Sequence, residues 1–303
     1  MTASDTNVHR PSAGKPVFLD YDQAGLDAAY NQAAYAPHSE HVRRRMVYAS
    51  EAVRAKIGQP QRHAYGDASI EGLDVYPTME RNAPILVFIH GGAWKRGLAS
   101  QNAFPAEMFV KAGVHYIVPD FSWVQDAADS LRTLADQIRR SLIWVYQNAE
   151  KLNADRSRIH LAAHSSGAHL AAVALTTDWQ KDYEPALPEN FISGAVLCSG
   201  MYDLHPVRLS SRSSYVKFDD DLEFKLSPQR HIERIGAPVV LLHGTRETPE
   251  FQRQSIDFDE ALRNSGKSVR LTAAQEYDHF EIKETLANPY GPFGHAVISQ
   301  IFL

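Results

Sequence analysis

Short apolar runs alternate with helical patterns along most of the chain. Eight runs have the length and composition of strands, at residues 61–65, 73–76, 85–90, 115–118, 159–162, 194–198, 239–243 and 269–273. The clearest helical pattern covers residues 127–152, with one apolar face made of Leu131, Leu134, Ile138, Leu142 and Val145. Buried strands separated by helices predict an α/β protein with a mostly parallel, doubly wound sheet and helices on both faces. The short runs before Pro77 are candidates for an antiparallel edge of that sheet.

Three segments stand outside this alternation. Residues 1–16 are polar and aperiodic, so we expect a disordered tail there. Residues 17–57 carry two helical patterns split near Pro37, which predicts an N-terminal helical cap. Residues 202–236 contain no strand pattern of their own. We expect them to form a small lid insertion over the carboxyl ends of the strands, where open α/β sheets bind ligands. Residues 17–303 as a whole are interpreted as one domain.

Residues 158–175 (RIHLAAHSSGAHLAAVAL) have a strand-turn-helix pattern. An apolar strand ends at Ala163, a tight turn through Ser165 follows, and a helix begins at once. This is the context of a nucleophile elbow, G-x-S-x-G, with Ala163 in place of the first glycine and Gly167 as the second. The motif predicts that Ser165 is a catalytic nucleophile. The alternative is a serine that only caps a helix.

The segment PILVFIHGGAWKRG, residues 84–97, favours the catalytic interpretation. Its apolar strand runs into His90, Gly91 and Gly92. Consecutive glycines let bare backbone amides approach a developing negative charge. We therefore expect the amides of Gly91, Gly92 and Ser166 to form an oxyanion hole. The alternative is a glycine turn that joins a strand to a helix.

A serine nucleophile of this kind needs an acid and a base later in the chain, in the order Ser, Asp or Glu, His. The strand at 239–243 is followed by Gly244 and then by Glu247, and the strand at 269–273 leads to His279. His279 is the candidate base, and Glu247 is the candidate acid that holds its tautomer. The rival acids are Glu250, Asp203 and Asp278.

Composition and charge narrow the range of partners. The chain has 31 basic and 36 acidic residues, a formal charge of −5, and no long run of either sign. This argues against a surface for nucleic acid or for an anionic membrane. The longest apolar runs are strand-length, far short of the roughly 20 residues of a membrane helix. Cys198 is the single cysteine and the first 16 residues lack an apolar signal stretch, so a cytoplasmic protein is expected.

The sequence gives no sign of a metal or an organic cofactor. It contains neither H-E-x-x-H nor paired C-x-x-C, and His164 and His169 are five residues apart, on different faces of a helix. No Walker or Rossmann glycine pattern follows a strand. We expect no metal, no ATP and no NAD, and a small-molecule substrate as the partner. A homodimer stays an open alternative.

Five strings together resemble one known family. HGGAW, AHSSGAHL, SGMYDLHP (199–206), ETPEFQRQS (247–255) and YDHF are similar to the α/β-hydrolase kynurenine formamidases, or arylformamidases, which hydrolyse N-formylkynurenine in tryptophan catabolism. The resemblance runs from about Pro84 to the C-terminus. HGG and the elbow are shared with the wider hormone-sensitive-lipase-like esterases, whereas SGMYDLHP and TPEFQRQS are more particular to the formamidases.

This resemblance implies an α/β-hydrolase fold and a cofactor-free catalytic site. Its triad falls on Ser165, Glu247 and His279, and its oxyanion hole on Gly91, Gly92 and Ser166. The family usually has Asp where Glu247 stands and Gly where Ala163 stands, and the segment after Pro206 has diverged.

The activity expected from these observations is removal of a formyl group from an aryl amide through an acyl-enzyme. Four side chains near the motifs are candidates for binding the substrate: Trp94, Tyr202, Phe280 and His164. Ordinary core packing is the alternative for each aromatic ring. Two other functions stay open. One is a short-chain carboxylesterase, and the other is a ligand-binding receptor built on a hydrolase scaffold.

Overall fold

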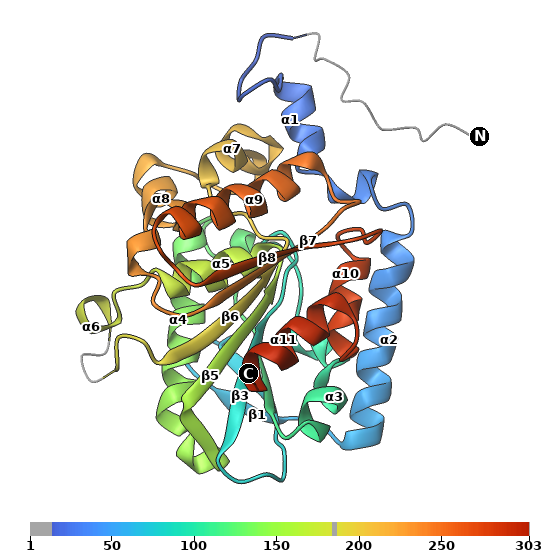
Figure 1. Cartoon of the computed structure of the whole chain (residues 1–303), viewed down its shortest axis with the longest axis vertical. Coiled ribbons are helices and arrows are strands. Elements are labelled where there is room, and N and C mark those ends of the chain that lie inside the picture. The colour runs from blue at the N-terminus through green and yellow to red at the C-terminus, as the bar shows by residue number, and fades with distance from the viewer. Residues whose placement is uncertain (1–13, 184–186, 303) are drawn as a thin grey trace.

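A computed structural model describes residues 14–183 and 187–302, and these form one eight-stranded sheet (Figure 1). The strands are β1 (Gln61–Ala64), β2 (Gly72–Tyr76), β3 (Ala83–Ile89), β4 (His115–Pro119), β5 (Ala154–His164), β6 (Ile192–Cys198), β7 (Val239–Gly244) and β8 (Val269–Ala274). Their order is β1-β2-β4-β3-β5-β6-β7-β8. β2 is antiparallel to β1 and β4, and the other neighbours are parallel. The predicted fold class, the eight strand positions and the antiparallel edge are confirmed.

Helices cover both faces of this sheet (Figure 1). The α-helices are α1 (Gln23–Ala29), α2 (Ser39–Ile57), α3 (Ala106–Lys111), α4 (Leu131–Asn148), α5 (Ser166–Leu175), α6 (Trp179–Asp182), α7 (Leu204–Leu209), α8 (Asp220–Lys225), α9 (Pro249–Asn264), α10 (Glu281–Glu284) and α11 (Pro292–Phe302). On one face α4, α5 and α9 share a core with Val87, and on the other α2, α3 and α11 share a core with Phe88. Because successive strand residues point to opposite faces, β3 must be apolar throughout.

Two elements differ in length from their predicted ranges. The helix expected at 127–152 is α4, followed by a 3₁₀ turn at Glu150–Leu152. It begins late because Ala128 and Asp129 have positive φ angles, 53° and 60°, and the Ser130 hydroxyl accepts the Arg132 amide as an N-cap. β5 extends beyond residues 159–162 at both ends. Its first half is polar and partly exposed, which leaves no apolar pattern to detect.

The N-terminal helices lie on two different sides of the molecule. α1 packs against α7 and α9, whereas α2 packs against α3 and α10. The link between them contains the 3₁₀ turn η1 (Gln32–Ala34). Of the tail predicted at residues 1–16, residues 1–13 lie outside the described residues. Residues 14–16 are exposed, and the Gly14 amide donates to Asp22.

Residues 202–236 contain only short helices, as expected from their lack of a strand pattern. They form α7, α8 and the 3₁₀ turns η5 (Ser211–Ser214), η6 (Pro228–Arg230) and η7 (Ile232–Arg234). Within the described ranges, no helix combines the length and the apolar character that crossing a membrane requires.

Candidate active site

Ser165 lies in the sharp turn between β5 and α5. Its φ and ψ angles are 57° and −127°, a strained backbone for a residue with a side chain. The turn is closed by Gly167, where an added Cβ would lie 2.2 Å from the Ile89 carbonyl oxygen and 2.4 Å from that of His90. Only glycine lets α5 approach β3 this closely. The local geometry is that of a nucleophile elbow.

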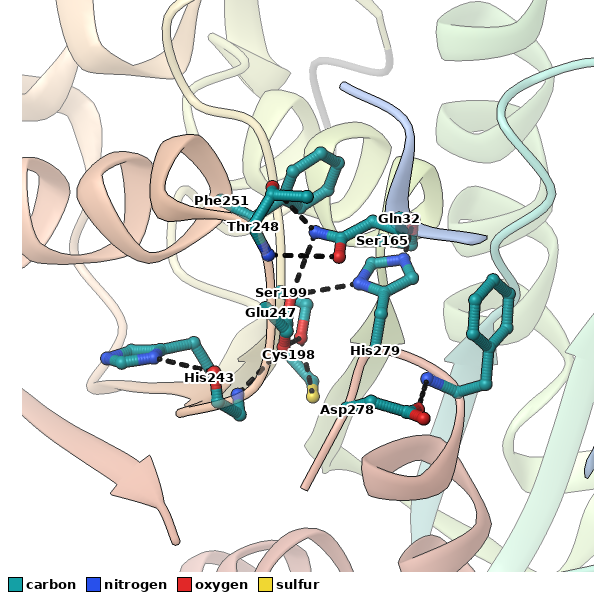
Figure 2. Close-up of polar contacts among 12 residues, drawn as sticks. Gln32, Ser165, Cys198, Ser199, His243, Glu247, Thr248, Phe251, Asp278 and His279 are labelled. Atoms are coloured by element: carbon teal, nitrogen blue, oxygen red, sulfur yellow. Dashed lines mark hydrogen bonds and ion pairs between the residues drawn. The ribbon is translucent and has the colours of Figure 1, made fainter. Parts of the chain in front are cut away.

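The structure brings Ser165, His279 and Glu247 into one hydrogen-bonded chain (Figure 2). Nε2 of His279 lies 2.9 Å from the Ser165 Oγ, and Nδ1 lies 2.9 Å from Oε2 of Glu247. The serine follows β5, the glutamate follows β7, and the histidine follows β8, so three parallel strands deliver them to one edge of the sheet. In this arrangement the imidazole can take the serine proton while the carboxylate holds its tautomer.

The carboxylate of Glu247 is fixed by three further donors. Oε1 accepts the Gly244 amide at 2.7 Å and the Ser199 hydroxyl at 2.5 Å. Nε2 of Gln32 approaches Oε2 at 3.4 Å and bonds Thr248 Oγ1 at 3.2 Å. A buried carboxylate whose lone pairs are occupied has one orientation available. Glu247 therefore presents Oε2 to the imidazole.

The rival acids have other partners. Glu250 pairs with Arg253 on the same helix, with Nη2 and Oε1 2.6 Å apart. Asp278 and Asp203 accept backbone amides at the starts of α10 and α7. None of the three bonds to His279 in the described part of the chain, so the geometry favours Glu247.

His164 supports the backbone of His279. Its Nε2 donates to the His279 carbonyl oxygen at 2.8 Å, and the two rings lie 4.7 Å apart. Complete burial, with a further contribution from His279, holds the pKa of His164 well below 6.5. The ring is therefore neutral near pH 7, with its proton on the donating nitrogen. His164 lines the cavity, as expected, but its hydrogen bond makes it a positioning residue.

The loop after β3 leaves backbone amides free beside the serine. Among the described residues, no hydrogen bond uses the amides of Gly91, Gly92 or Ser166. Gly92 has a φ of 140°, and a Cβ there would lie 1.9 Å from the Arg96 carbonyl oxygen. The Trp94 amide donates to the Ser166 Oγ at 3.2 Å, which ties this loop to the elbow. The arrangement can serve as an oxyanion hole.

The prediction that Trp94 and Tyr202 bind the substrate is wrong, because neither residue lines the cavity at Ser165. The Trp94 side chain is 1% exposed and packs edge-to-face on His169 of α5, since the left-handed backbone at residues 93 and 94 turns it inward. Tyr202 is fully buried and stacks on Phe258 of α9 at 4.2 Å. Both rings belong to the core.

A cavity of about 860 Å³ opens at Ser165 and His279. Phe280 lines it, as predicted, and the other aromatic lining residues are Tyr30, Trp123 and Tyr215. Gln32 and Arg212 also line it. Sequence reasoning missed these residues, which come from the N-terminal segment, from the loop after β4 and from residues 202–236, because no motif surrounds them. Only folding brings them to the triad.

The structure accommodates the two departures from the formamidase pattern, Ala163 in place of Gly and Glu247 in place of Asp. Ala163 is fully buried and paired with Ile89 and Leu197, so the sheet accommodates its methyl group. Glu247 reaches the imidazole with its longer side chain. The sheet order, the elbow after β5 and the acid and histidine after β7 and β8 define an α/β hydrolase.

Comparison with known proteins identifies the family. The BD-FAE family model matches residues 73–262, and the chain belongs to this family as a kynurenine formamidase-like α/β hydrolase. It is 31% identical to the kynurenine formamidase of Danio rerio, over 74% of this chain and 75% of that protein. It is 27% identical to esterase LipC of Mycobacterium tuberculosis, over 69% of this chain and 56% of that protein. A protein from Silicibacter sp. tm1040 has the same fold, with a TM-score of 0.79 at 24% identity, covering 92% of this chain and 99% of its own.

Proposed function

We propose that this protein is a serine hydrolase that removes a small acyl group, formyl, from an aryl amide such as N-formylkynurenine. The observation that carries the proposal is the position of His279, 2.9 Å from both the Ser165 hydroxyl and the Glu247 carboxylate. Similarity to kynurenine formamidases supports an aryl formamide as the substrate. The aromatic lining of the cavity supports an aryl leaving group.

In the first half of the reaction Ser165 Oγ attacks the formyl carbon and His279 Nε2 takes the hydroxyl proton. The carbonyl oxygen becomes an oxyanion and accepts hydrogen bonds from the amides of Gly91, Gly92 and Ser166. The C–N bond then breaks as His279 returns its proton to the departing nitrogen. The aryl amine leaves, and the formyl group stays on the serine as an ester.

In the second half His279 takes a proton from water, whose oxygen attacks the formyl ester. Collapse of the second oxyanion releases formate, and the proton returns to Ser165. The hydrogen bonds of Glu247 keep the imidazole in the tautomer with Nδ1 protonated, so it stabilises the imidazolium in both halves.

A small acyl group fits the surroundings of the serine. A Cβ at Gly91 would lie 3.0 Å from the Cβ of Ser165 and 2.8 Å from the His164 carbonyl oxygen. The oxyanion loop therefore lies close against the nucleophile on one side. Formyl is the smallest acyl group, whereas each added methylene must find room beside this loop.

The experiment that tests this proposal is kcat/KM for formyl, acetyl, butyryl and octanoyl derivatives of one aryl leaving group. The expected result is a maximum at formyl and a decline with chain length. A maximum at octanoyl rejects the formamidase proposal in favour of a lipase-like esterase.

A short-chain carboxylesterase is the second candidate, supported by the similarity to esterase LipC. A maximum at acetyl or butyryl esters, with formamides poorly cleaved, would favour it. The receptor alternative predicts no turnover of any substrate. The hydrogen-bonded Ser165, His279 and Glu247 give that alternative no support.

A further inference from the structure

The cavity at Ser165 has a charge opposite to that of the chain. The chain carries a formal charge of −5, yet the cavity lining has more cationic than acidic side chains. The cationic residues are Arg43, Arg44, Lys95, Arg96, Arg212 and Lys283. The acidic ones are Glu40, which pairs with Arg43 at 2.9 Å, and Asp27, which accepts the Ser211 amide. A cleft lined by one sign of charge attracts ligands of the other.

Arg212 is the most constrained of these cations. It comes from η5, within residues 202–236, and is only 8% exposed. Nη1 donates to the Tyr215 hydroxyl at 2.8 Å and Nη2 to the Tyr30 carbonyl oxygen at 3.2 Å. Its Nε is buried without an acceptor. No carboxylate among the described residues pairs with it, although a buried charge without a counterion is costly.

Aromatic rings and other cations surround the Arg212 guanidinium, an environment that favours binding of an anion. Its guanidinium lies 5.6 Å from the Tyr30 ring and 5.5 Å from the Trp94 ring, and neither ring neutralises its charge. Lys95 lies over the Tyr215 ring at 4.3 Å. Burial lowers the pKa of Lys95, and the nearby charges of Arg96 and Arg212 lower it further. An anion between these cations would relieve their repulsion.

We propose that Arg212, with Lys95, forms a subsite that binds the carboxylate of the substrate, remote from the scissile bond, and that these two residues set the preference for a substrate with that carboxylate. This rests on the proposed formamidase function and specifies the residues that recognise its substrate. A guanidinium matches the two oxygens of a carboxylate better than an ammonium does, and Nη1 and Nη2 each have a second N–H beyond the one in their hydrogen bonds to Tyr215 and Tyr30. Arg212 of this subsite comes from η5, and Lys95 comes from the loop after β3. The Trp94 ring beside Arg212 connects it to the oxyanion loop.

The test compares two matched formamides. One is ortho-formamidoacetophenone, which is neutral, and the other is the deamino analogue of N-formylkynurenine, which has the same aryl ketone and a carboxylate. We expect the wild type to prefer the carboxylate substrate in kcat/KM by roughly 10- to 100-fold, the range for hydrogen bonds to a charged group. Arg212→Gln and Lys95→Gln should each reduce that preference at least several-fold, mainly through KM.

Arg263→Gln is the matched control, because Arg263 is an exposed arginine of α9 that pairs with Asp259 and does not line the cavity. It should keep the wild-type preference. The proposal is overturned if the wild type shows no preference for the carboxylate. It is also overturned if Arg212→Gln lowers both activities equally, since Arg212 would then only connect the lid to the N-terminal segment. If Arg212→Gln does not fold, Lys95→Gln decides.

Calorimetric binding separates this proposal from the formamidase proposal. If neither formamide is cleaved, the proposed function fails, but both compounds can still be titrated into the Ser165→Ala protein. Tighter binding of the carboxylate compound, lost when Arg212→Gln is added, supports the subsite. Equal affinity for the two compounds contradicts it.

Discussion

Glu247 shows how one carboxylate becomes the partner of the histidine. Four acidic side chains follow the last strands closely enough to be candidates in the sequence. Backbone amides occupy two of the rivals, because Asp203 and Asp278 accept hydrogen bonds from N–H groups at the starts of helices. The strand-turn-helix motif and the order of the residues were sufficient to predict Ser165 and His279. The selection of the acid depends on hydrogen bonds that only the folded chain makes.

Replacing Glu247 with Gln should lower kcat by about 10³-fold or more, because an amide no longer fixes the imidazole tautomer. Glu250→Gln is the matched control. It removes a buried carboxylate on a side chain of the same length, but one that pairs with Arg253. Steady-state kinetics on an aryl formamide measures both. A larger loss of kcat in Glu250→Gln or Asp203→Asn would reassign the acid.

Gln32 links the N-terminal segment to the acid. It lies in η1, and its amide contacts Glu247 while its carbonyl oxygen accepts the Thr248 amide at 3.2 Å. We expect Gln32→Ala to lower kcat about 10-fold, the effect of losing one or two hydrogen bonds in a buried network. Gln32→Glu should lower it further by placing a like charge beside Glu247. Unchanged kcat in both variants would show that the N-terminal segment does not help to position Glu247.

Strands and helices could be predicted where hydrophobic residues recur with a clear periodicity. The conformation of the loops between them could not be predicted in this way. β3 and β7 read as buried strands because both faces are covered. By contrast, Trp94 lies on a loop whose left-handed backbone directs its ring into the core, and no hydrophobic pattern encodes that direction. The aromatic lining residues Tyr30, which follows α1, and Tyr215, which follows η5, were missed for the same reason. Loops position functional groups through backbone conformation rather than through periodicity.

The loop after β3 depends on glycine at position 92. Gly92→Val would place a branched side chain against the Arg96 carbonyl oxygen. It would thereby displace the amides that we propose bind the oxyanion. We expect kcat to fall about 10²-fold or more, the scale of losing one donor. Gly58→Ala is the control, since Gly58 also has a positive φ, 96°, but nothing lies within 4 Å of an added Cβ. Equal kcat in Gly92→Val and the wild type would make this loop purely structural.

At the scale of the whole molecule, several buried and neutral histidines lie in and beside the sheet. Burial lowers the pKa of His90, His160 and His169 to about 4. The alternation of strands and helices predicts the sheet that buries them, and so the fold followed from the sequence. Which histidines lose their charge did not follow, because burial of a single side chain depends on the neighbours that pack over it.

These histidines predict acid sensitivity. Below pH 6.5 the unfolded chain binds protons that the folded protein does not, so the free energy of unfolding falls as the pH falls from 6.5 towards 4. Each such histidine contributes about 1.4 kcal/mol per pH unit in that interval. Urea midpoints at pH 7, 6 and 5 measure the slope. His160→Leu should reduce it, and the exposed His295→Leu should not. A midpoint that is flat from pH 7 to 5 would contradict this.

The central claim is that Ser165 acts as the nucleophile in hydrolysis of an aryl formamide. The most direct test is the rate of kynurenine release from N-formylkynurenine by the wild type, by Ser165→Ala, and by Ser157→Ala, an exposed serine of β5, as the control. We predict turnover by the wild type and by Ser157→Ala, and a loss of about 10³-fold or more in Ser165→Ala. Turnover that survives in Ser165→Ala, or its absence in the wild type, would contradict the claim.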